Sequence, residues 1–329
     1  MGTVVRIVLF AVDAHTASAA SDAAFARVAA LDDIMSDYKL TSELTHLSEG
    51  AGGPAVEVSG DLYRVLAAGE DLARRSDGAF DITVGPVVQL WRRARRRHEL
   101  PDPERLARAV ARVGYDKLRL DPVARTAELT QPGMQLDLGG IAKGYAADEA
   151  LGVLKRLGIS CALVAAAGDI AAGAAPPGRA GWRIEIAPLG DPAEGAAQAD
   201  GPWSKPRSRT EKRISDARFR ILHTARYLQL HDAGISTSGD AEQHVEVGGV
   251  RYAHIVDPRT GQALTGHFEV TVLAPNDFIA DGLATAVSVM GPQRGLEVIR
   301  ATAGAGVLFL QETADGVRSW SWRFPELSN

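Results

Sequence analysis

Hydrophobic residues recur at helical spacing in several stretches of the chain. Residues 16–31 are rich in alanine and place Phe25, Val28 and Leu31 on one face, which predicts an amphipathic helix. Leucine and valine residues after Ser59 share one face in the same way, and a serine is a favoured N-cap residue. Further helices are expected after the Asp102-Pro103 pair and over residues 142–157, 279–290 and 293–301.

Other stretches alternate between apolar and polar residues, as strands with one buried face do. The clearest is WRIEIA at residues 182–187. Gly248 and Gly249 separate two short apolar runs, which is typical of a tight hairpin. A glycine-bounded strand carrying Asp81 is expected over residues 78–86. Other short strands are expected at 1–10, 117–120, 126–130, 162–164, 219–222, 227–230, 245–247, 252–256, 269–273, 307–310 and 317–322.

Some stretches show neither period. Residues 189–217 are rich in proline, glycine, serine and both charges, so they predict a long, mobile surface loop. Residues 32–53 are rich in turn formers, and residues 236–240 (STSGD) form a polar step expected to be a loop. Hairpins mixed with isolated helices, without an internal repeat, indicate a mixed α/β fold with helices packed on a sheet. The length of 329 residues allows one large domain or two medium ones.

Composition and charge narrow the possible partners. The chain has 36 Lys and Arg against 41 Asp and Glu, and this net charge of -5 argues against nucleic acid as the main partner. Its one cysteine, Cys161, excludes an internal disulfide and a cysteine-based metal site, so a metal would be held by oxygen or imidazole. No apolar run approaches the roughly 20 residues of a membrane span. The sequence does not indicate an oligomeric state.

The first ten residues, MGTVVRIVLF, lack the pattern of a secretory leader. The sequence as given therefore predicts a cytoplasmic protein, or a periplasmic or exported one if a leader precedes it in a longer reading frame. The chain itself does not decide between these compartments.

Asp281 and Thr285 are four positions apart in a predicted helix, so they lie one turn apart on the same face. A carboxylate and a hydroxyl are hard oxygen ligands, suited to Mg²⁺ together with water and substrate phosphates. The alternative is that Asp281 is a favourable charge near the helix N-terminus while Thr285 faces the core. From the spacing alone this structural alternative is favoured over the metal site.

A glycine pair at residues 139 and 140 lies between a strand end and a helix start, where backbone can approach a phosphate closely. Lys143 falls in the first helical turn, an unfavourable place for a cation unless it meets an anion. A tight turn followed by a solvated lysine explains the same pattern equally well.

His254 precedes a turn built by Asp257 and Pro258, which fixes the direction of its side chain. Histidine is the usual general base near neutral pH, and Arg259 beyond the turn is suited to a phosphate. A structural role remains open, since the chain has eight histidines. The basic run WRRARRRH at residues 91–98 is expected to be a solvated helix end without a functional role.

Taken together and in order, these segments resemble the ApbE family, the FAD:protein FMN transferases. Any one segment is a weak signal, whereas eight in register over nearly the whole chain are specific. The segments that carry the resemblance are residues 1–7, 32–44, 78–91, 136–148, 168–170, 236–243, 251–261 and 280–291.

The resemblance implies an enzyme with a single two-lobed domain over residues 1–329. That domain would have a mixed, largely antiparallel sheet, packed helices and a ligand cleft between the lobes. Such an enzyme binds FAD and holds a divalent cation, usually Mg²⁺, against its pyrophosphate. It transfers FMN to a threonine or serine hydroxyl of an acceptor flavoprotein through a phosphoester bond and releases AMP.

The resemblance also implies residue roles. Asp281 and Thr285 would be metal ligands together with the backbone carbonyl of Gly140, and Asp281 would thereby take part in catalysis. His254 would be the base or hydrogen-bonding group near the attacking hydroxyl. The residues expected to contact FAD or line the flavin pocket are Met35, Ala79, Phe80, Asp81, Asp137, Lys143 and Ile255.

The chain departs from the family pattern at three places. Family members usually carry Asn or Asp and then two glycines before the Asp-Ile at 169 and 170, whereas this chain has Ala165, Ala166, Ala167 and Gly168. Ala253 stands where relatives often have Ser or His, and many relatives have a lipoprotein leader that this sequence lacks. Two alternatives remain open: an FAD pyrophosphatase that releases FMN and AMP, and a flavin-binding carrier without turnover.

Overall fold

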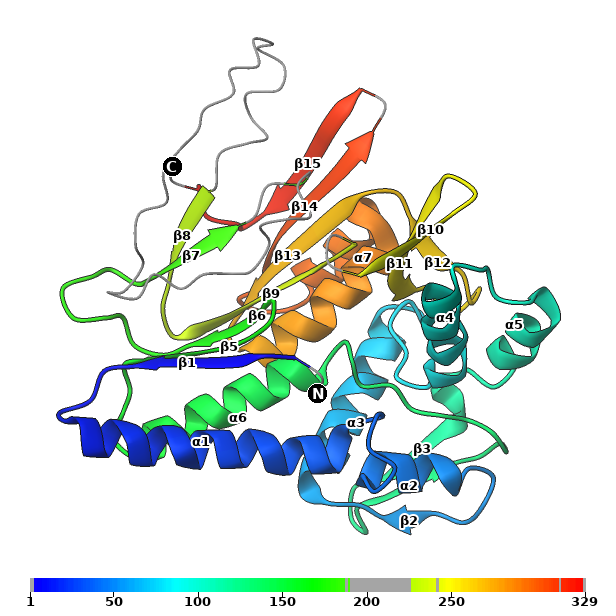
Figure 1. The fold of residues 1–329 in the computed structure, drawn as a ribbon, viewed down its shortest axis with the longest axis horizontal. Helices are drawn as coiled ribbons and strands as arrows, with labels where there is room; N and C mark the ends of the chain where they lie inside the picture. Colours follow the sequence, from blue (N-terminus) through cyan, green and yellow to red (C-terminus); the bar gives the residue numbers. More distant parts are fainter. Residues whose placement is uncertain (1–2, 187–188, 190–225, 241–242, 314, 328–329) are drawn as a thin grey trace.

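The structure is a computed structural model that describes residues 3–186, 189, 226–240, 243–313 and 315–327. The described residues form a seven-stranded sheet in which every neighbouring pair is antiparallel (Figure 1). In spatial order its strands are β1 (Val5–Leu9), β5 (Ala162–Ala166), β6 (Asp169–Ala172), β9 (Ala233–Gly239), β13 (Phe268–Ala274), β14 (Gly306–Thr313) and β15 (Gly316–Trp322).

Long helices cover one face of this sheet: α1 (Ala14–Met35), α6 (Ala142–Arg156) and α7 (Asp277–Arg300) (Figure 1). Small residues allow the close packing, because α6 buries several alanines against α1 and β5. The opposite face is covered by a two-stranded sheet of β7 (Trp182–Ile186) and β8 (Arg226–Leu230). The central strands β5 and β6 of the main sheet are buried along their whole length.

The remaining elements form a second region beside the sheet (Figure 1). Its helices are α2 (Glu43–Glu49), α3 (Gly60–Arg75), α4 (Gly85–Arg97) and α5 (Pro103–Val110), with a short 3₁₀ turn at Tyr115–Lys117. One three-stranded sheet contains β2 (Val56–Glu57), β4 (Thr126–Leu129) and β3 (Leu118–Asp121), and another contains β10 (His244–Val247), β11 (Val250–Val256) and β12 (Ala263–Thr265).

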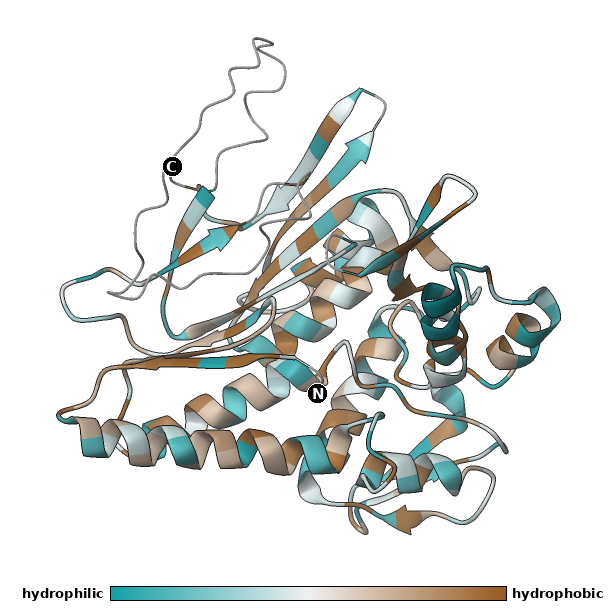
Figure 2. Ribbon diagram, in the orientation of Figure 1, coloured by the Kyte–Doolittle hydropathy of each residue, from teal (hydrophilic) through white to brown (hydrophobic). Residues whose placement is uncertain are grey.

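One hydrophobic core joins the two regions. Leu62 of α3 and Met134 belong to the same buried cluster as Val270 of β13 and Leu283 of α7. Figure 2 shows apolar residues on the surfaces where sheet and helices meet, whereas α4 is strongly hydrophilic. The ligand cleft described below lies at the boundary of the two regions and so has walls from both.

Most of the predicted elements are confirmed. Ser59 caps α3 by accepting a hydrogen bond from the backbone N–H of Leu62, and Asp102 caps α5 from the backbone N–H of Arg105. β7 is buried on alternate residues, as WRIEIA predicts. Gly248 and Gly249 both have positive φ in the β10–β11 hairpin, and Gly291 breaks the last long helix at the predicted position. The mixed, largely antiparallel fold is confirmed.

The strand predicted over residues 78–86 is wrong. These residues form a turn, because the Asp81 carboxylate accepts hydrogen bonds from the backbone N–H and the hydroxyl of Thr83. α4 then begins at Gly85, with Pro86 in its first turn, where the missing N–H costs nothing.

Two predicted loops are also partly wrong. Residues 32–53 contain the end of α1 and the whole of α2, which Ser42 caps through the backbone N–H of Thr45. Residues 236–239 belong to β9, where Ser236 hydrogen-bonds Asp169 and Thr237 hydrogen-bonds Thr271. A hydroxyl that hydrogen-bonds to a residue of a neighbouring strand is as compatible with a sheet as with a loop.

Several predictions fall outside the described residues. Of the loop predicted at 189–217, only Leu189 is described, and it is buried. The strand predicted at 219–222 lies outside them entirely. Among the described helices, none is long and apolar enough to cross a membrane.

Candidate active site

A cavity of about 420 Å³ lies between the sheet and the second region. Apolar and polar groups both face it, which is typical of a small-molecule site. The eleven residues to which the family resemblance assigned a site role all line it: Met35, Ala79, Phe80, Asp81, Asp137, Gly140, Lys143, His254, Ile255, Asp281 and Thr285. Arg259, which the sequence suggested for a phosphate, is not among the lining residues and pairs with Asp257 instead.

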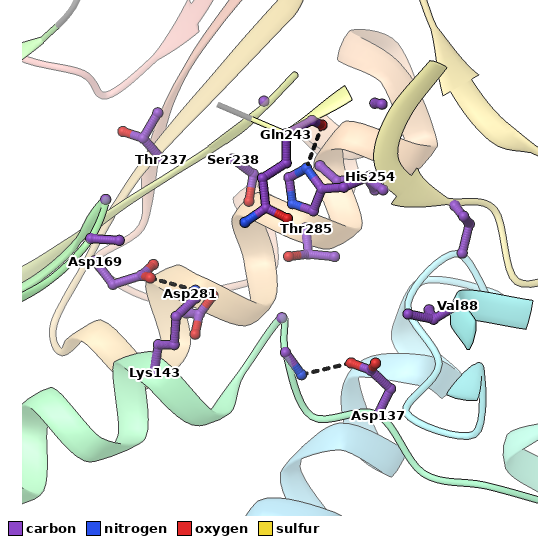
Figure 3. Close-up of a pocket in the computed structure, with 18 of the residues that line it drawn as sticks. Val88, Asp137, Lys143, Asp169, Thr237, Ser238, Gln243, His254, Asp281 and Thr285 are labelled. Atoms are coloured by element: carbon purple, nitrogen blue, oxygen red, sulfur yellow. Dashed lines mark hydrogen bonds and ion pairs between the residues drawn. The ribbon is translucent and has the colours of Figure 1, made fainter. Parts of the chain in front are cut away.

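One wall of the cavity is the contact between α6 and α7. A side chain at Gly144 would meet the backbone carbonyl oxygen of Asp277 at 2.3 Å, so glycine is required for this approach. The backbone N–H of Gly144 donates to Oδ2 of Asp281 at 3.0 Å. Nζ of Lys143 lies 3.3 Å from Oδ1 of Asp281 and also pairs with Asp169 (Figure 3).

Burial and charge act together at this wall. The Asp281 side chain is 2% exposed, and burial, with the nearby Asp169 carboxylate, raises the pKa of Asp281. Burial alone would lower the pKa of Lys143, but the carboxylates of Asp169 and Asp281 outweigh it and raise that pKa. Lys143 is therefore a cation held at the edge of the cavity, suited to an anionic ligand.

Gly140 lies directly opposite Thr285. A Cβ atom added to Gly140 would lie 2.8 Å from Oγ1 of Thr285, so only glycine leaves that hydroxyl accessible from the loop. The preceding turn is fixed by Asp137, whose Oδ1 accepts a hydrogen bond from the backbone N–H of Gly139 at 2.8 Å (Figure 3). The Gly139-Gly140 loop, the Thr285 hydroxyl and the Asp281 carboxylate all line the cavity.

These oxygen donors fit a hard divalent cation. Among the described residues, no three His, Cys, Asp or Glu side chains form a metal cluster. A cation here would accordingly need backbone and hydroxyl oxygens, water and substrate phosphates besides the Asp281 carboxylate, which is the mixed ligand set that Mg²⁺ accepts.

His254 on β11 faces the cavity (Figure 3). Its ring Nδ1 lies 3.2 Å from the backbone carbonyl oxygen of Gln243, and its backbone N–H donates to that same oxygen. Because a carbonyl oxygen only accepts, Nδ1 carries the hydrogen and Nε2 has a free lone pair in the neutral ring. The ring is exposed to the cavity, yet the surrounding walls, with Lys143 and Arg95, lower the pKa of His254.

Residues 1–309 match the family model described as the ApbE family. The chain belongs to the ApbE family. It is 32% identical to the FAD:protein FMN transferase of Haemophilus influenzae over 89% of this chain and 79% of the relative. It is also 32% identical to the protein of that name from Treponema pallidum, over 94% of this chain and 82% of the relative.

Solved ApbE structures share the fold. The flavin transferase ApbE from Vibrio cholerae superposes with a TM-score of 0.77 and 28% identity, covering 98% of this chain and 94% of that one. The apo flavinyl transferase ApbE of Pseudomonas stutzeri gives a TM-score of 0.78 and 27% identity, covering 98% of this chain and 92% of that one. Membership of the ApbE family makes the chain an enzyme, a transferase.

A second wall of the cavity is apolar. Met35, Phe80 and Ile255 are each at most 6% exposed and face the cavity from three different elements. Burial raises the pKa of Asp81, whose carboxylate is engaged by Thr83 and so fixes the turn that presents Phe80. In an ApbE protein such a wall is suited to a planar, largely apolar ring.

The ApbE motifs did not reveal the role of two arginines of the basic run. Arg92 pairs with Asp37, donates to Asp137 at 2.8 Å and lies over the ring of Tyr38. Arg95 also lines the cavity. The prediction that the basic run is a solvated helix end is confirmed for residues 93 and 96–98, which are exposed. It is wrong for Arg92 and Arg95. The sequence feature that could have identified Arg92 and Arg95 is their three-residue spacing, which places both on one face of a helix.

Asp169 is another cavity residue without an assigned role. It begins β6, is 2% exposed, pairs with Lys143 and accepts a hydrogen bond from the Ser236 hydroxyl at 2.5 Å. The pairing joins α6 to β6 and β9. The sequence signal was present in the Gly-Asp-Ile segment at 168–170, which belongs to the ApbE resemblance.

The departure from the ApbE pattern at Ala167 has a structural consequence. Ala167 lies in the β5–β6 turn with φ of 57°, where an L-residue with a Cβ is disfavoured relative to glycine. The chain therefore keeps the left-handed turn at a cost of about 1 kcal/mol.

Proposed function

We propose that this enzyme transfers FMN from FAD to a threonine or serine hydroxyl of an acceptor flavoprotein, releases AMP, and requires Mg²⁺. The observation that supports this most strongly is the convergence of Lys143, Asp281, Thr285 and His254 on one cavity. A cation, oxygen ligands for a metal and a neutral base are the groups that displacement at phosphorus needs.

In this proposal, the Gly140 carbonyl, Asp281 and Thr285 would hold Mg²⁺ near the pyrophosphate of FAD. Gly140 supports the assignment, because any side chain there would occlude the Thr285 hydroxyl. When bound, the ion supplies positive charge that stabilises the charge developing on the phosphates. Asp137 orients the Gly139-Gly140 turn, and Lys143 neutralises charge on the same pyrophosphate.

His254 acts as the base. Nε2 takes the proton of the acceptor hydroxyl as the hydroxyl oxygen forms its bond to the phosphorus of the FMN moiety. The bond from that phosphorus to the oxygen of AMP breaks, and AMP leaves with the electron pair. The apolar wall of Met35, Phe80 and Ile255 holds the isoalloxazine ring and excludes water from it.

The metal assignment is tested by a pair of matched variants. Thr285→Val removes the hydroxyl and keeps the shape, whereas Thr285→Ser keeps the hydroxyl. Mutation of a residue that hydrogen-bonds to a metal ligand typically lowers metal affinity by about 10- to 100-fold. Loss of a ligand itself should cost at least as much, so we expect Thr285→Val to raise the Mg²⁺ concentration for half-maximal AMP release by at least about tenfold.

Thr285→Ser is expected to stay near the wild type, and EDTA should abolish AMP release from both. A valine variant with unchanged Mg²⁺ dependence would contradict the assignment. Analysis of the acceptor protein distinguishes the proposed transferase from the two alternatives. Release of AMP and free FMN without a labelled acceptor would indicate an FAD pyrophosphatase. Binding of FAD without release of AMP would indicate a carrier.

A further inference from the structure

Gln243 lies immediately before β10, and its exposed side chain lines the cavity. Its backbone carbonyl holds both the ring and the backbone N–H of His254. Figure 3 shows its side chain reaching into the cavity beside the His254 ring, with Lys143 and Asp281 on the facing wall. An amide group thus lies next to the proposed base, across the cavity from the proposed cation and metal ligands.

Arg95 of α4 orients this amide. Its Nη1 donates to Oε1 of Gln243 at 2.9 Å. A guanidinium has donors only, so the atom facing Arg95 must be the amide oxygen. The amide nitrogen, with its two hydrogens, consequently faces away from Arg95 and is available to a ligand in the cavity.

We propose that the Gln243 amide donates a hydrogen bond to the phosphoryl group that is transferred, and that Arg95 is the positioning residue for this amide. This inference rests on the proposed function. When the acceptor oxygen bonds to phosphorus and the bond to AMP breaks, negative charge develops on the non-bridging oxygens. Pre-oriented donors aimed at that charge lower the barrier.

The side chain beside the base is neutral, although Arg95 still lowers the pKa of His254. A guanidinium in direct contact with His254 would disfavour the imidazolium that forms when Nε2 accepts the proton. Gln243 places a neutral donor beside the histidine and keeps Arg95 behind it. The Gln243 amide neither gains nor loses a proton. It therefore affects the rate of phosphoryl transfer and takes no part in the proton transfer.

Side-chain variants distinguish this role from support of His254, because the bonds to His254 come from the Gln243 backbone. We expect Gln243→Ala to lower the single-turnover rate of AMP release at saturating FAD and Mg²⁺ by about 10²-fold, the usual loss for one such donor. Gln243→Glu, which replaces the NH₂ by a charged oxygen, should lower it at least as much. FAD affinity, measured by flavin fluorescence, should change by less than about threefold in both.

Arg95→Ala should lower the same rate by about tenfold, and Arg95→Lys, which retains a donor, should recover part of it. Arg96→Ala is the matched control, an exposed arginine of the same helix, and should leave the rate unchanged.

A Gln243→Ala rate within about twofold of the wild type would overturn the inference, as would a loss confined to FAD affinity. Equal melting temperatures of the variants exclude misfolding as the cause, and the isosteric Gln243→Glu gives the same test if the alanine variant is unstable. These outcomes presuppose an active wild type. If the wild type releases no AMP, the proposed function fails, whereas an active wild type with insensitive variants overturns this inference alone.

Discussion

At the scale of single residues, the proposed proton transfer depends on the protonation state of His254. The Gln243 carbonyl fixes the hydrogen on Nδ1, so the free nitrogen Nε2 faces the cavity. The walls of the cleft, with Lys143 and Arg95, disfavour the charged ring and lower its pKa. A base is active when it is deprotonated, so a lowered pKa keeps His254 active throughout the neutral range and below it.

This state can be measured directly. In a histidine-selective NMR titration of the wild type, with His254→Gln used to assign the signal, His254 should titrate with a midpoint below the ordinary value of about 6.5. At pH 7 it should show the neutral form with hydrogen on Nδ1. A midpoint at or above that value, or the Nε2–H form at pH 7, would contradict the account of this residue.

The individual site residues were largely predictable, because the ApbE motifs are short and local. Met35, Lys143 and Asp281 each lie in a segment whose sequence carries the resemblance, and the cavity brings those segments together. Arg95 and Gln243 were not predicted as site residues. Their contact joins residues 148 positions apart, and neither residue type signals it locally.

At the scale of secondary structure, the junction of α6 with α7 positions the wall that carries the proposed metal ligands. Asp148 on α6 accepts hydrogen bonds from the backbone N–H groups of Asp277 at 3.1 Å and Phe278 at 2.8 Å, in the first turn of α7. Burial raises the pKa of Asp148 to about 6, so above pH 7 the carboxylate is ionised and both oxygens accept. A side chain of α6 thus caps α7, which carries Asp281 and Thr285.

Removing this cap should destabilise the protein. Asp148→Ala leaves two helix N–H groups without their acceptor, so we expect the free energy of unfolding at pH 7.5 to fall by about 1–2 kcal/mol. Asp148→Asn, which retains one acceptor oxygen, should lose less. Urea denaturation measures both, with Asp22→Ala on the exposed side of α1 as the control. Equal stabilities of Asp148→Ala and the control would show that the cap contributes nothing.

Elements were predictable where their pattern is regular, as in α6 and β7, and not where polar residues are satisfied by distant partners. β9 contains Ser236 and Thr237, which are typical of a loop in isolation. In the sheet, their hydroxyls form hydrogen bonds with Asp169 and Thr271 on the neighbouring strands. Only the paired structure shows that this polar stretch is compatible with a buried strand.

At the scale of the whole molecule, the two regions share one hydrophobic core and enclose the cavity at their boundary. The sheet and its helices supply Met35, Lys143, Asp169, Asp281 and Thr285, whereas the second region supplies Phe80 and Ile255 of the apolar wall. The order of the strands could not be predicted, because antiparallel neighbours such as β6 and β9 are far apart in the chain. The family resemblance predicted the fold where local patterns could not.

The central claim is that FMN leaves FAD and becomes attached to a protein hydroxyl. The most direct test incubates the purified enzyme with FAD, Mg²⁺ and a candidate acceptor flavoprotein, and measures AMP by chromatography and the acceptor by mass spectrometry. The account predicts one AMP released for each FMN attached, with the adduct on a threonine or serine. AMP without an adduct on a flavinylatable acceptor, or no AMP at all, would contradict it.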